Sequence, residues 1–283
     1  MAELTSEKIC DLWSAIQEER PVIHCITNVI TINDCANILL AAGASPTMAH
    51  HPLEAAEVTE RCRALVCNLG ATESFEAMLA AARRASEIGH PIVLDPVGVS
   101  GSSYRRSLCF ELMNQAMPSV IRGNLSEIRA IATQSCTAAG VDAAKEDMIH
   151  GKNLDDTAKI VQRLAKNRGT IVIASGETDV ISNGNVVYSV HNGSRMMSGI
   201  TGSGCMASVL LGAFLSIENT LESAAAACCV MGICGELAQR RTRELRAGTG
   251  TYRTELIDAV SLLKRTQIKE MARVEKYEST EQI

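Results

Sequence analysis

The chain has 283 residues, of which 46% are hydrophobic and 21% charged, so it can bury a large core and is not generally disordered. Its net charge of −5 and its 3% of aromatic residues argue against nucleic acid as the main partner, because phosphate binding needs clustered Lys and Arg and base stacking needs aromatic rings. The 11 cysteines form no Cys-x-x-Cys pair, which indicates free thiols in a reducing compartment. The polar start of the chain resembles no signal peptide, and we expect a cytoplasmic protein.

Short apolar strands alternate with helices along the first half of the chain. The helices are predicted at 6–19, 32–42, 74–88, 103–116 and 125–132, and the strands at 21–26, 64–69, 91–95 and 119–123. The strands are continuously apolar, which is typical of a parallel sheet that is buried on both faces. The pattern therefore predicts βαβ units in a layered α/β domain.

The second half continues this pattern after a stretch of small and polar residues. Residues 133–153 are aperiodic and predict a surface insertion. Beyond them we expect a helix at 154–167, a strand at 170–175, a hairpin around Asn183-Gly184, and helices at 204–217, 221–241 and 253–266. The uncharged run 196–217 begins with many Gly, Ser and Thr residues, which favours a core helix over a membrane span. We thus predict a single domain over 1–270, a loose charged tail at 271–283 and no membrane contact.

A glycine-rich run, Gly199 to Cys205, opens the predicted helix that ends near residue 217. Glycines let a ligand approach the backbone, and the free N–H groups and dipole of a helix start attract anions, so Gly202, Ser203, Gly204 and Cys205 are candidates for an anion hole. The same dipole favours the thiolate of Cys205, which could then act as a base or a nucleophile. The alternatives are a turn that packs a helix closely and a small buried cysteine.

Ligands of parallel α/β sheets bind beyond the carboxyl ends of the strands, and acidic and basic residues stand there in this chain. Asp95 could hold Mg²⁺ through water, or it could simply form a turn before a proline. Arg122 could clamp phosphate, and Glu127 could help to hold the metal. However, Asn124 and Glu127 have the spacing of a helix N-cap and its third-residue acid, and capping alone would explain both.

Taken together, the motifs resemble those of the hydroxyethylthiazole kinase family over about residues 21–265. The runs that carry the resemblance are HCITNVITIN, ANILLAAGASPTM, LDPVGVSGSSYR, IRGNLSEI, HNG and TGSGCMAS. Related ribokinase-like kinases commonly have Asp where Cys205 stands, and Cys marks the thiazole branch. The chain departs from the family pattern at two positions: GSGC replaces the usual GTGC, and Ser175 replaces the usual Thr. Both changes are mild, because serine keeps the hydroxyl group.

The resemblance implies a ribokinase-like three-layer α/β sandwich with a mostly parallel central sheet, and a homotrimer with active sites near subunit contacts. It implies that ATP, with Mg²⁺, phosphorylates the hydroxyl of 4-methyl-5-(2-hydroxyethyl)thiazole in thiamine salvage. Cys205 matches the position of the presumed base. Met48, Asn28 and Gly202 match thiazole-contact positions, Arg122 and Ser175 match nucleotide-contact positions, and Asp95 and Glu127 match the metal and phosphate acids.

Three other functions stay open at this point. The first is a kinase for another vitamin precursor alcohol, of the hydroxymethylpyrimidine or pyridoxal type, although Cys at position 205 speaks against it. The second is a transferase that forms a covalent adduct on Cys205 with help from His24 or His191. The third is a non-catalytic ligand-binding relative, which is disfavoured by the joint presence of Asp95, Arg122, Glu127 and Cys205.

Overall fold

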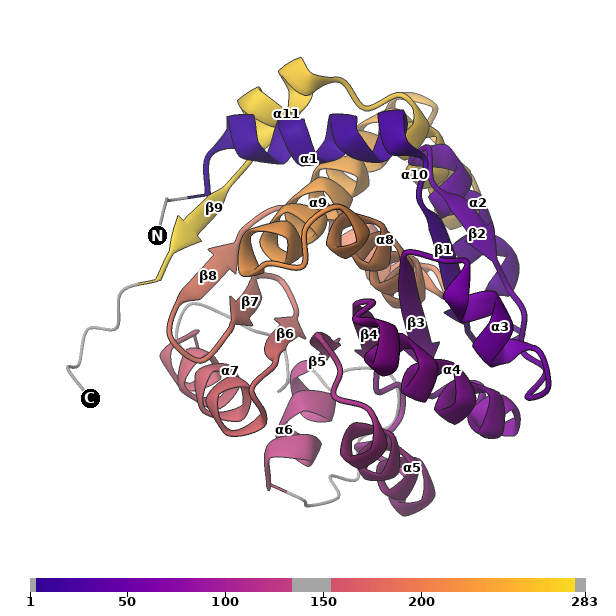
Figure 1. Ribbon diagram of the computed structural model, residues 1–283. Helices are drawn as coiled ribbons and strands as arrows, with labels where there is room; N and C mark the ends of the chain where they lie inside the picture. The colour runs from indigo at the N-terminus through magenta and orange to yellow at the C-terminus, as the bar shows by residue number, and fades with distance from the viewer. Residues whose placement is uncertain (1–3, 134–153, 278–283) are drawn as a thin grey trace.

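The computed structural model describes residues 4–133 and 154–277, and within them nine strands form one sheet in the order β2-β1-β3-β4-β5-β6-β7-β8-β9 (Figure 1). The strands are β1 (Val22–Ile26), β2 (Ser45–Thr47), β3 (Ala64–Asn68), β4 (Ile92–Asp95), β5 (Val120–Asn124), β6 (Ile171–Ser175), β7 (Asp179–Ser182), β8 (Val187–Val190) and β9 (Val274–Lys276). The pairs from β2 to β6 are parallel, and those from β6 to β9 are antiparallel. The predicted fold class, with a mostly parallel central sheet, is confirmed.

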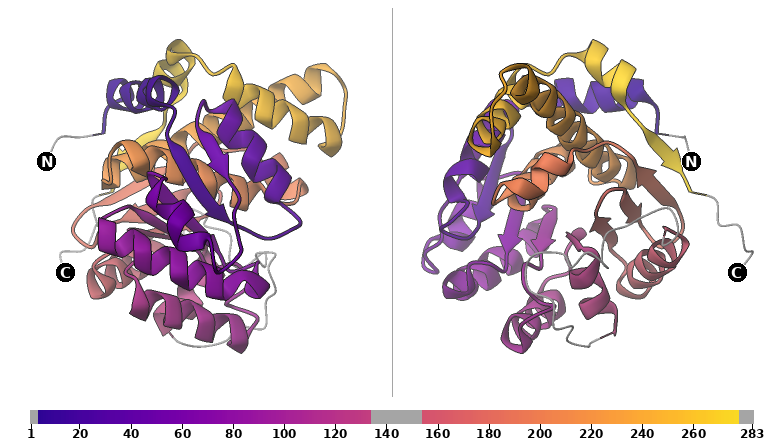
Figure 2. Two further views of the ribbon diagram at one scale, coloured as in Figure 1. Left: turned by 45° about the vertical axis from the view of Figure 1, so that its right-hand side comes forward. Right: turned by 180° about the vertical axis from the view of Figure 1, so that it is seen from behind.

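Helices cover both faces of the sheet and give the molecule three layers (Figure 2). One face carries α1 (Ser6–Glu19), α2 (Ile32–Ala41), α8 (Ser203–Ile217), α9 (Leu221–Glu244), α10 (Thr249–Ser261) and α11 (Arg265–Met271). The other carries α3 (Ala55–Glu60), α4 (Phe75–Ile88), α5 (Ser103–Gln115), α6 (Leu125–Thr133) and α7 (Leu154–Arg168). Successive strand residues point to opposite faces. Val66 therefore joins the first core, whereas its neighbours Leu65 and Cys67 join the second.

The helices α8 and α9, which contain long apolar runs, lie in the core. The helix α8 is buried along nearly its whole length, and a Cβ added to Gly212 would lie 2.7 Å from Val66 Cγ2, so glycine lets the helix approach the sheet closely. The helix α9 is long and apolar enough to cross a membrane, but 83% of its apolar window is buried inside the protein. Both are thus core helices, as the sequence predicts for the run that ends at residue 217.

The structure corrects the sequence predictions mainly in short elements. The strand β2 and the helix α3 were not predicted, and the helix expected at 253–266 is divided into α10 and α11. The prediction of a loose tail from residue 271 is wrong for the described part, because Val274–Lys276 pairs with β8 as an edge strand and Tyr277 N donates to Val187 O at 2.9 Å. The predicted insertion lies almost wholly at 134–153, outside the described residues.

Candidate active site

Four neighbouring strands bring polar side chains to one edge of the sheet. Asn28 follows β1, Asn68 ends β3, Asp95 ends β4, and Arg122 lies near the carboxyl end of β5. These strands are adjacent in the order β1-β3-β4-β5, and Asn68 and Asp95 are direct partners in the β3–β4 register. Parallel strands end at the same edge, so residues up to about 95 positions apart in sequence meet in one place.

The start of α8 faces this edge. Gly202 is its N-cap and has φ +84°, and a Cβ there would lie 2.7 Å from Thr31 Cγ2, so the position requires glycine for both its backbone and its contact. Met206 N donates to Gly202 O at 2.8 Å. The backbone N–H groups that precede Met206 therefore have no partner in the preceding turn of the helix, which leaves them available to an anion.

The thiol of Cys205 lies in this first turn and is 9% exposed. Its Sγ accepts from Asn68 Nδ2 at 3.2 Å and from Asn28 Nδ2 at 3.6 Å. Burial, followed by the charge of Asp95, raises the pKa of Cys205, while hydrogen bonds from Thr31, Asn68 and Asn28 lower it. Burial thus opposes the effect of the helix start that would favour the thiolate of Cys205.

The carboxylate of Asp95 is buried, and its Oδ2 accepts from Ser208 Oγ at 2.7 Å and from Asn68 Nδ2 at 3.0 Å. It thus faces α8 and β3 and does not cap the turn that follows it. Its Oδ1 accepts no hydrogen bond from the residues at 4–133 and 154–277, which leaves that oxygen free for a cation or water. Burial raises the pKa of Asp95, although the charge of Arg122 opposes the shift.

The guanidinium of Arg122 adds a positive charge next to the helix start. It is 8% exposed, and Nη1 donates to Gly204 O at 3.1 Å and to Ser208 Oγ at 3.4 Å. Its Nε and Nη2 donate to no other group in the described part of the chain. A buried arginine with spare donors, beside free helix N–H groups, has the chemistry that suits a phosphate group.

Glu127 has the capping geometry that the sequence offered as the alternative to a metal ligand. Its Oε2 accepts from Asn124 N, and Asn124 Oδ1 accepts from Glu127 N, both at 2.9 Å, while Oε1 accepts from Gly98 N at 2.9 Å. Burial, followed by the charge of Asp95, raises the pKa of Glu127 to about 7. Each carboxylate oxygen can accept more than one bond, so capping does not exclude a cation. Two repelling carboxyl groups with a free oxygen fit a hard ion such as Mg²⁺.

The remaining predicted residues flank this centre. Met48 follows the edge strand β2 and is partly buried against the core, and Ser175 ends β6, where its Oγ donates to Gly123 O at 3.2 Å. Neither shares a hydrogen bond with Cys205 in the described residues. The structure therefore brings Asn28, Asp95, Arg122 and Cys205 together and leaves Met48 and Ser175 on opposite sides of them.

The two histidines considered as partners of Cys205 are bound elsewhere. The buried ring of His24 lies 2.8 Å from Thr59 Oγ1 and 2.8 Å from Ala49 O, so both of its nitrogens are used. The ring of His191 contacts Thr178 Oγ1 at 3.3 Å and Ser189 Oγ at 3.1 Å. This arrangement disfavours a transferase in which a histidine activates Cys205.

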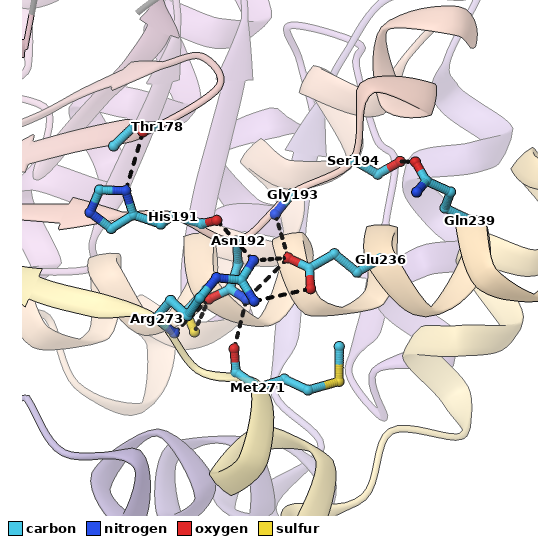
Figure 3. Close-up of polar contacts among 10 residues, drawn as sticks. Thr178, His191, Asn192, Gly193, Ser194, Glu236, Gln239, Met271 and Arg273 are labelled. Carbon is cyan, nitrogen blue, oxygen red and sulfur yellow. Dashed lines mark hydrogen bonds and ion pairs between the residues drawn. The ribbon is translucent and has the colours of Figure 1, made fainter. Parts of the chain in front are cut away.

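The HNG run, which the sequence singled out without a role, forms a second polar network (Figure 3). The side chain of Asn192 donates to Met271 O at 2.8 Å and to Glu236 Oε1 at 3.2 Å, and its Oδ1 accepts from Arg273 N at 2.8 Å. Glu236 Oε1 also accepts from Gly193 N at 2.8 Å and from Arg273 Nη2 at 2.5 Å. We call residues 192, 193, 236, 271 and 273 the brace, because they tie β8, α9 and the end of the described chain together.

Two residues of the brace, Asn192 and Gly193, lie just upstream of the glycine-rich run. The short 3₁₀ helix η3 (Arg195–Gly199) follows these two residues, and Ser203 Oγ donates to Met197 O at 2.8 Å, which joins η3 to the first turn of α8. The segment from Gly193 to Gly202 is thus fixed at one end by the brace and at the other by α8.

Comparison with known proteins gives a consistent answer. A model of the "Hydroxyethylthiazole kinase family" matches residues 13–266. The chain belongs to this family. It is 42% identical to "Hydroxyethylthiazole kinase 1" of Methanosphaera stadtmanae over 98% of this chain and 100% of that protein, and 41% identical to "Hydroxyethylthiazole kinase" of Clostridium acetobutylicum over 93% and 97%.

Solved structures agree with the sequence relatives. The hydroxyethylthiazole kinase protein of Pyrococcus horikoshii OT3 superposes with a TM-score of 0.85 at 30% identity, covering 96% of this chain and 100% of that one. A ribokinase-like superfamily protein of Enterococcus faecalis gives a TM-score of 0.58 at 13% identity over 89% and 87%, which supports the fold alone. The predicted family, ribokinase-like fold and kinase class are therefore confirmed.

Proposed function

We propose that this chain phosphorylates the hydroxyl group of 4-methyl-5-(2-hydroxyethyl)thiazole with ATP, as a step of thiamine salvage. The observation that carries the proposal is the placement of Cys205 in the first turn of α8, beside Asp95 and Arg122. The turn and the arginine suit the transferred phosphoryl group, and the thiol lies where a substrate hydroxyl can meet it. Family membership selects the thiazole alcohol over the other precursor alcohols.

In this mechanism the thiolate form of Cys205 accepts the hydroxyl proton, while the substrate oxygen bonds to the γ-phosphorus of ATP and the bond from that phosphorus to ADP breaks. The transition state of phosphoryl transfer is loose, so most of the rate enhancement comes from positioning and charge stabilisation and the base contributes modestly. The N–H groups of residues 203–205 and the guanidinium of Arg122 stabilise the charge that spreads over the phosphoryl oxygens. We assign thiazole contacts to Asn28, Met48 and Gly202, and nucleotide contacts to Arg122 and Ser175.

Mg²⁺ belongs to this proposal as the cofactor, held by Asp95 through its free Oδ1 and by Glu127, directly or through water. When bound, the ion neutralises charge on the ATP phosphates. Burial raises the pKa of both Asp95 and Glu127, and the charge of Asp95 adds to the shift of Glu127, so a bound cation would stabilise both carboxylates in their charged form.

We further propose that the chain works as a cytoplasmic homotrimer with its sites near subunit contacts. The support is a pair of exposed apolar side chains next to Asn28 in sequence: Val29 and Ile30 are 77% and 74% exposed in the loop after β1. Large exposed apolar side chains that adjoin one another are typical of contact surfaces. Light scattering after size exclusion tests this, and a monomer at micromolar concentration would contradict it.

The function itself is tested by ATP consumption with Mg²⁺, with and without the hydroxyethylthiazole, and by mass spectrometry of the phosphorylated product. Hydroxymethylpyrimidine and pyridoxal serve as competing acceptors. We expect ADP formation that depends on the thiazole. ADP formation that is equal with and without it, or faster with another acceptor, would overturn the proposal.

A further inference from the structure

The side chain of Asn68 stands between the two reactive groups of the site. It is 1% exposed, and its Nδ2 donates to Cys205 Sγ at 3.2 Å and to Asp95 Oδ2 at 3.0 Å. Its Oδ1 accepts from Gly70 N at 2.8 Å and from Asn28 Nδ2 at 3.4 Å. An amide nitrogen has two hydrogens, so one can point at the sulfur and the other at the carboxylate.

The surroundings leave this amide no other orientation. With the two ends exchanged, the carbonyl oxygen would face a carboxylate, and the NH₂ group would face the donor N–H of Gly70. A Cβ added at Gly70 would lie 2.7 Å from Asn68 Oδ1 and 3.0 Å from Asn28 Nδ2, so a glycine at that position leaves the space both asparagines use.

We infer that Asn68 is a positioning residue of the proposed reaction, which holds the Cys205 thiol and the Asp95 carboxylate apart and donates a hydrogen bond to each. When the Cys205 thiol ionises, the thiolate and the Asp95 carboxylate repel each other, and a neutral group that donates to both offsets the repulsion. Asn28 donates to the sulfur at the longer distance of 3.6 Å and does not reach Asp95, so Asn68 alone links the two groups among the described side chains. This inference rests on the proposed function.

The sharpest test is Asn68→Asp, which keeps the shape and the acceptor for Gly70 but replaces the donor by a carboxylate. We expect kcat to fall by about 100-fold or more, with the KM for the thiazole within about threefold, because the lost interaction acts on the reacting groups and not on binding. Asn68→Ala removes both ends of the amide and is expected to lower kcat by about tenfold. Asn114→Asp, the same change at an exposed position on α5, is the control and should match the wild type.

A second readout does not depend on turnover. The rate at which iodoacetamide alkylates Cys205 at pH 8, without substrate or metal, is followed by mass spectrometry of the peptide that contains it. Loss of the donor disfavours the thiolate, so we expect alkylation to slow by about tenfold in Asn68→Ala. If Asn68 had only a packing role, its replacement by alanine would loosen the site, and alkylation would be equally fast or faster.

The outcomes separate this inference from the proposed function. If the wild type fails to phosphorylate the thiazole, the proposed function fails, but alkylation still reports on Asn68. Equal or faster alkylation in Asn68→Ala, or a kcat of Asn68→Asp within threefold of the wild type, would overturn the inference. Asn68→Ala and Asn68→Ser decide the matter if thermal unfolding shows that the aspartate variant does not fold.

Discussion

Two buried asparagines organise two polar networks in this protein, and their partners differ in kind. Asn68 donates to a thiol and a carboxylate, whereas Asn192 donates to a backbone carbonyl and the ion-paired carboxylate of Glu236. Both amides have partners at both ends, as buried polar groups require. The partners therefore distinguish the two asparagines. Asn68 bonds two groups of the proposed reaction, whereas Asn192 fixes the loop that follows β8.

The largest expected effect comes from removing the charge of Asp95, the carboxylate to which both Asn68 and Ser208 donate. Asp95→Asn should lower kcat by about 10²- to 10³-fold, because a buried charge at the reacting centre is lost while the side-chain volume is kept. Steady-state kinetics and a thermal unfolding curve check this. Asp155→Asn, at an exposed position in the first turn of α7, is the matched control. A wild-type kcat in the Asp95→Asn variant would contradict the assignment of Asp95 to the active site.

A substitution in the brace should lower the stability of the protein and leave the reactivity of Cys205 unchanged. Asn192→Ala leaves Met271 O and Arg273 N without their side-chain partner, and we expect a loss of about 2–3 kcal/mol in the free energy of unfolding in urea. Alkylation of Cys205 should stay at the wild-type rate, unlike in Asn68→Ala. Asn185→Ala, at an exposed position between β7 and β8, should leave stability nearly unchanged. If Asn192→Ala slows alkylation as Asn68→Ala does, the two networks are not separate in function.

The thiol itself should matter less than Asp95. Cys205→Ala is expected to lower kcat by about 10- to 100-fold and leave measurable turnover, and Cys205→Asp should restore much of it, because a carboxylate can also accept the proton. Burial raises the pKa of Cys205, so wild-type activity should rise with pH as the thiol deprotonates. A carboxyl group ionises at lower pH, so the Cys205→Asp profile should extend further to the acid side. If both variants match the wild type at every pH, Cys205 is not the base.

The smallest effect is expected at the edge of the brace. Glu236→Gln keeps an acceptor for Gly193 N but removes the charge that pairs with Arg273, whose side chain is 48% exposed. Exposed ion pairs contribute little, so we expect a loss of up to about 1 kcal/mol, measured by urea unfolding at low and high salt. Glu244→Gln breaks a fully surface pair with Arg241 and serves as the control. If Glu236→Gln lost as much free energy of unfolding as Asn192→Ala, the ion pair with Arg273 would be the main contribution of the brace to stability.

The sequence predicted the long elements well, because their apolar patterns are set by burial on the sheet. It missed the strands β2 and β9, which have three residues each and are too short for a period to be seen. The antiparallel pairing of β9 depends on Arg273, whose contacts with Asn192 and Glu236 lie 81 and 37 residues away. No local pattern contains such a contact.

The same reasoning explains what was found and missed at the site. Asp95 and Cys205 are conspicuous in sequence, as an acid at a strand end and a thiol at a glycine-rich helix start. Asn68 also ends a strand, and the rule about strand ends could have identified it, but an amide carries no charge to draw attention. Ser208 lies one turn after Gly204 inside an apolar helix, and its bond to Asp95 spans 113 residues, so only the folded chain reveals it.

The brace also forms late during the synthesis of the protein. Met271 and Arg273 leave the ribosome after every residue of the site, and until they do, Asn192 lacks its partners on the C-terminal segment. During that time the segment from Gly193 to Gly202 can already bond α9, through Gly193 N to Glu236 and Ser194 Oγ to Gln239, and α8 through Ser203 Oγ. A nascent chain can therefore pair its strands from β2 to β8 and bury α8 before the bonds between Asn192 and the C-terminal segment form.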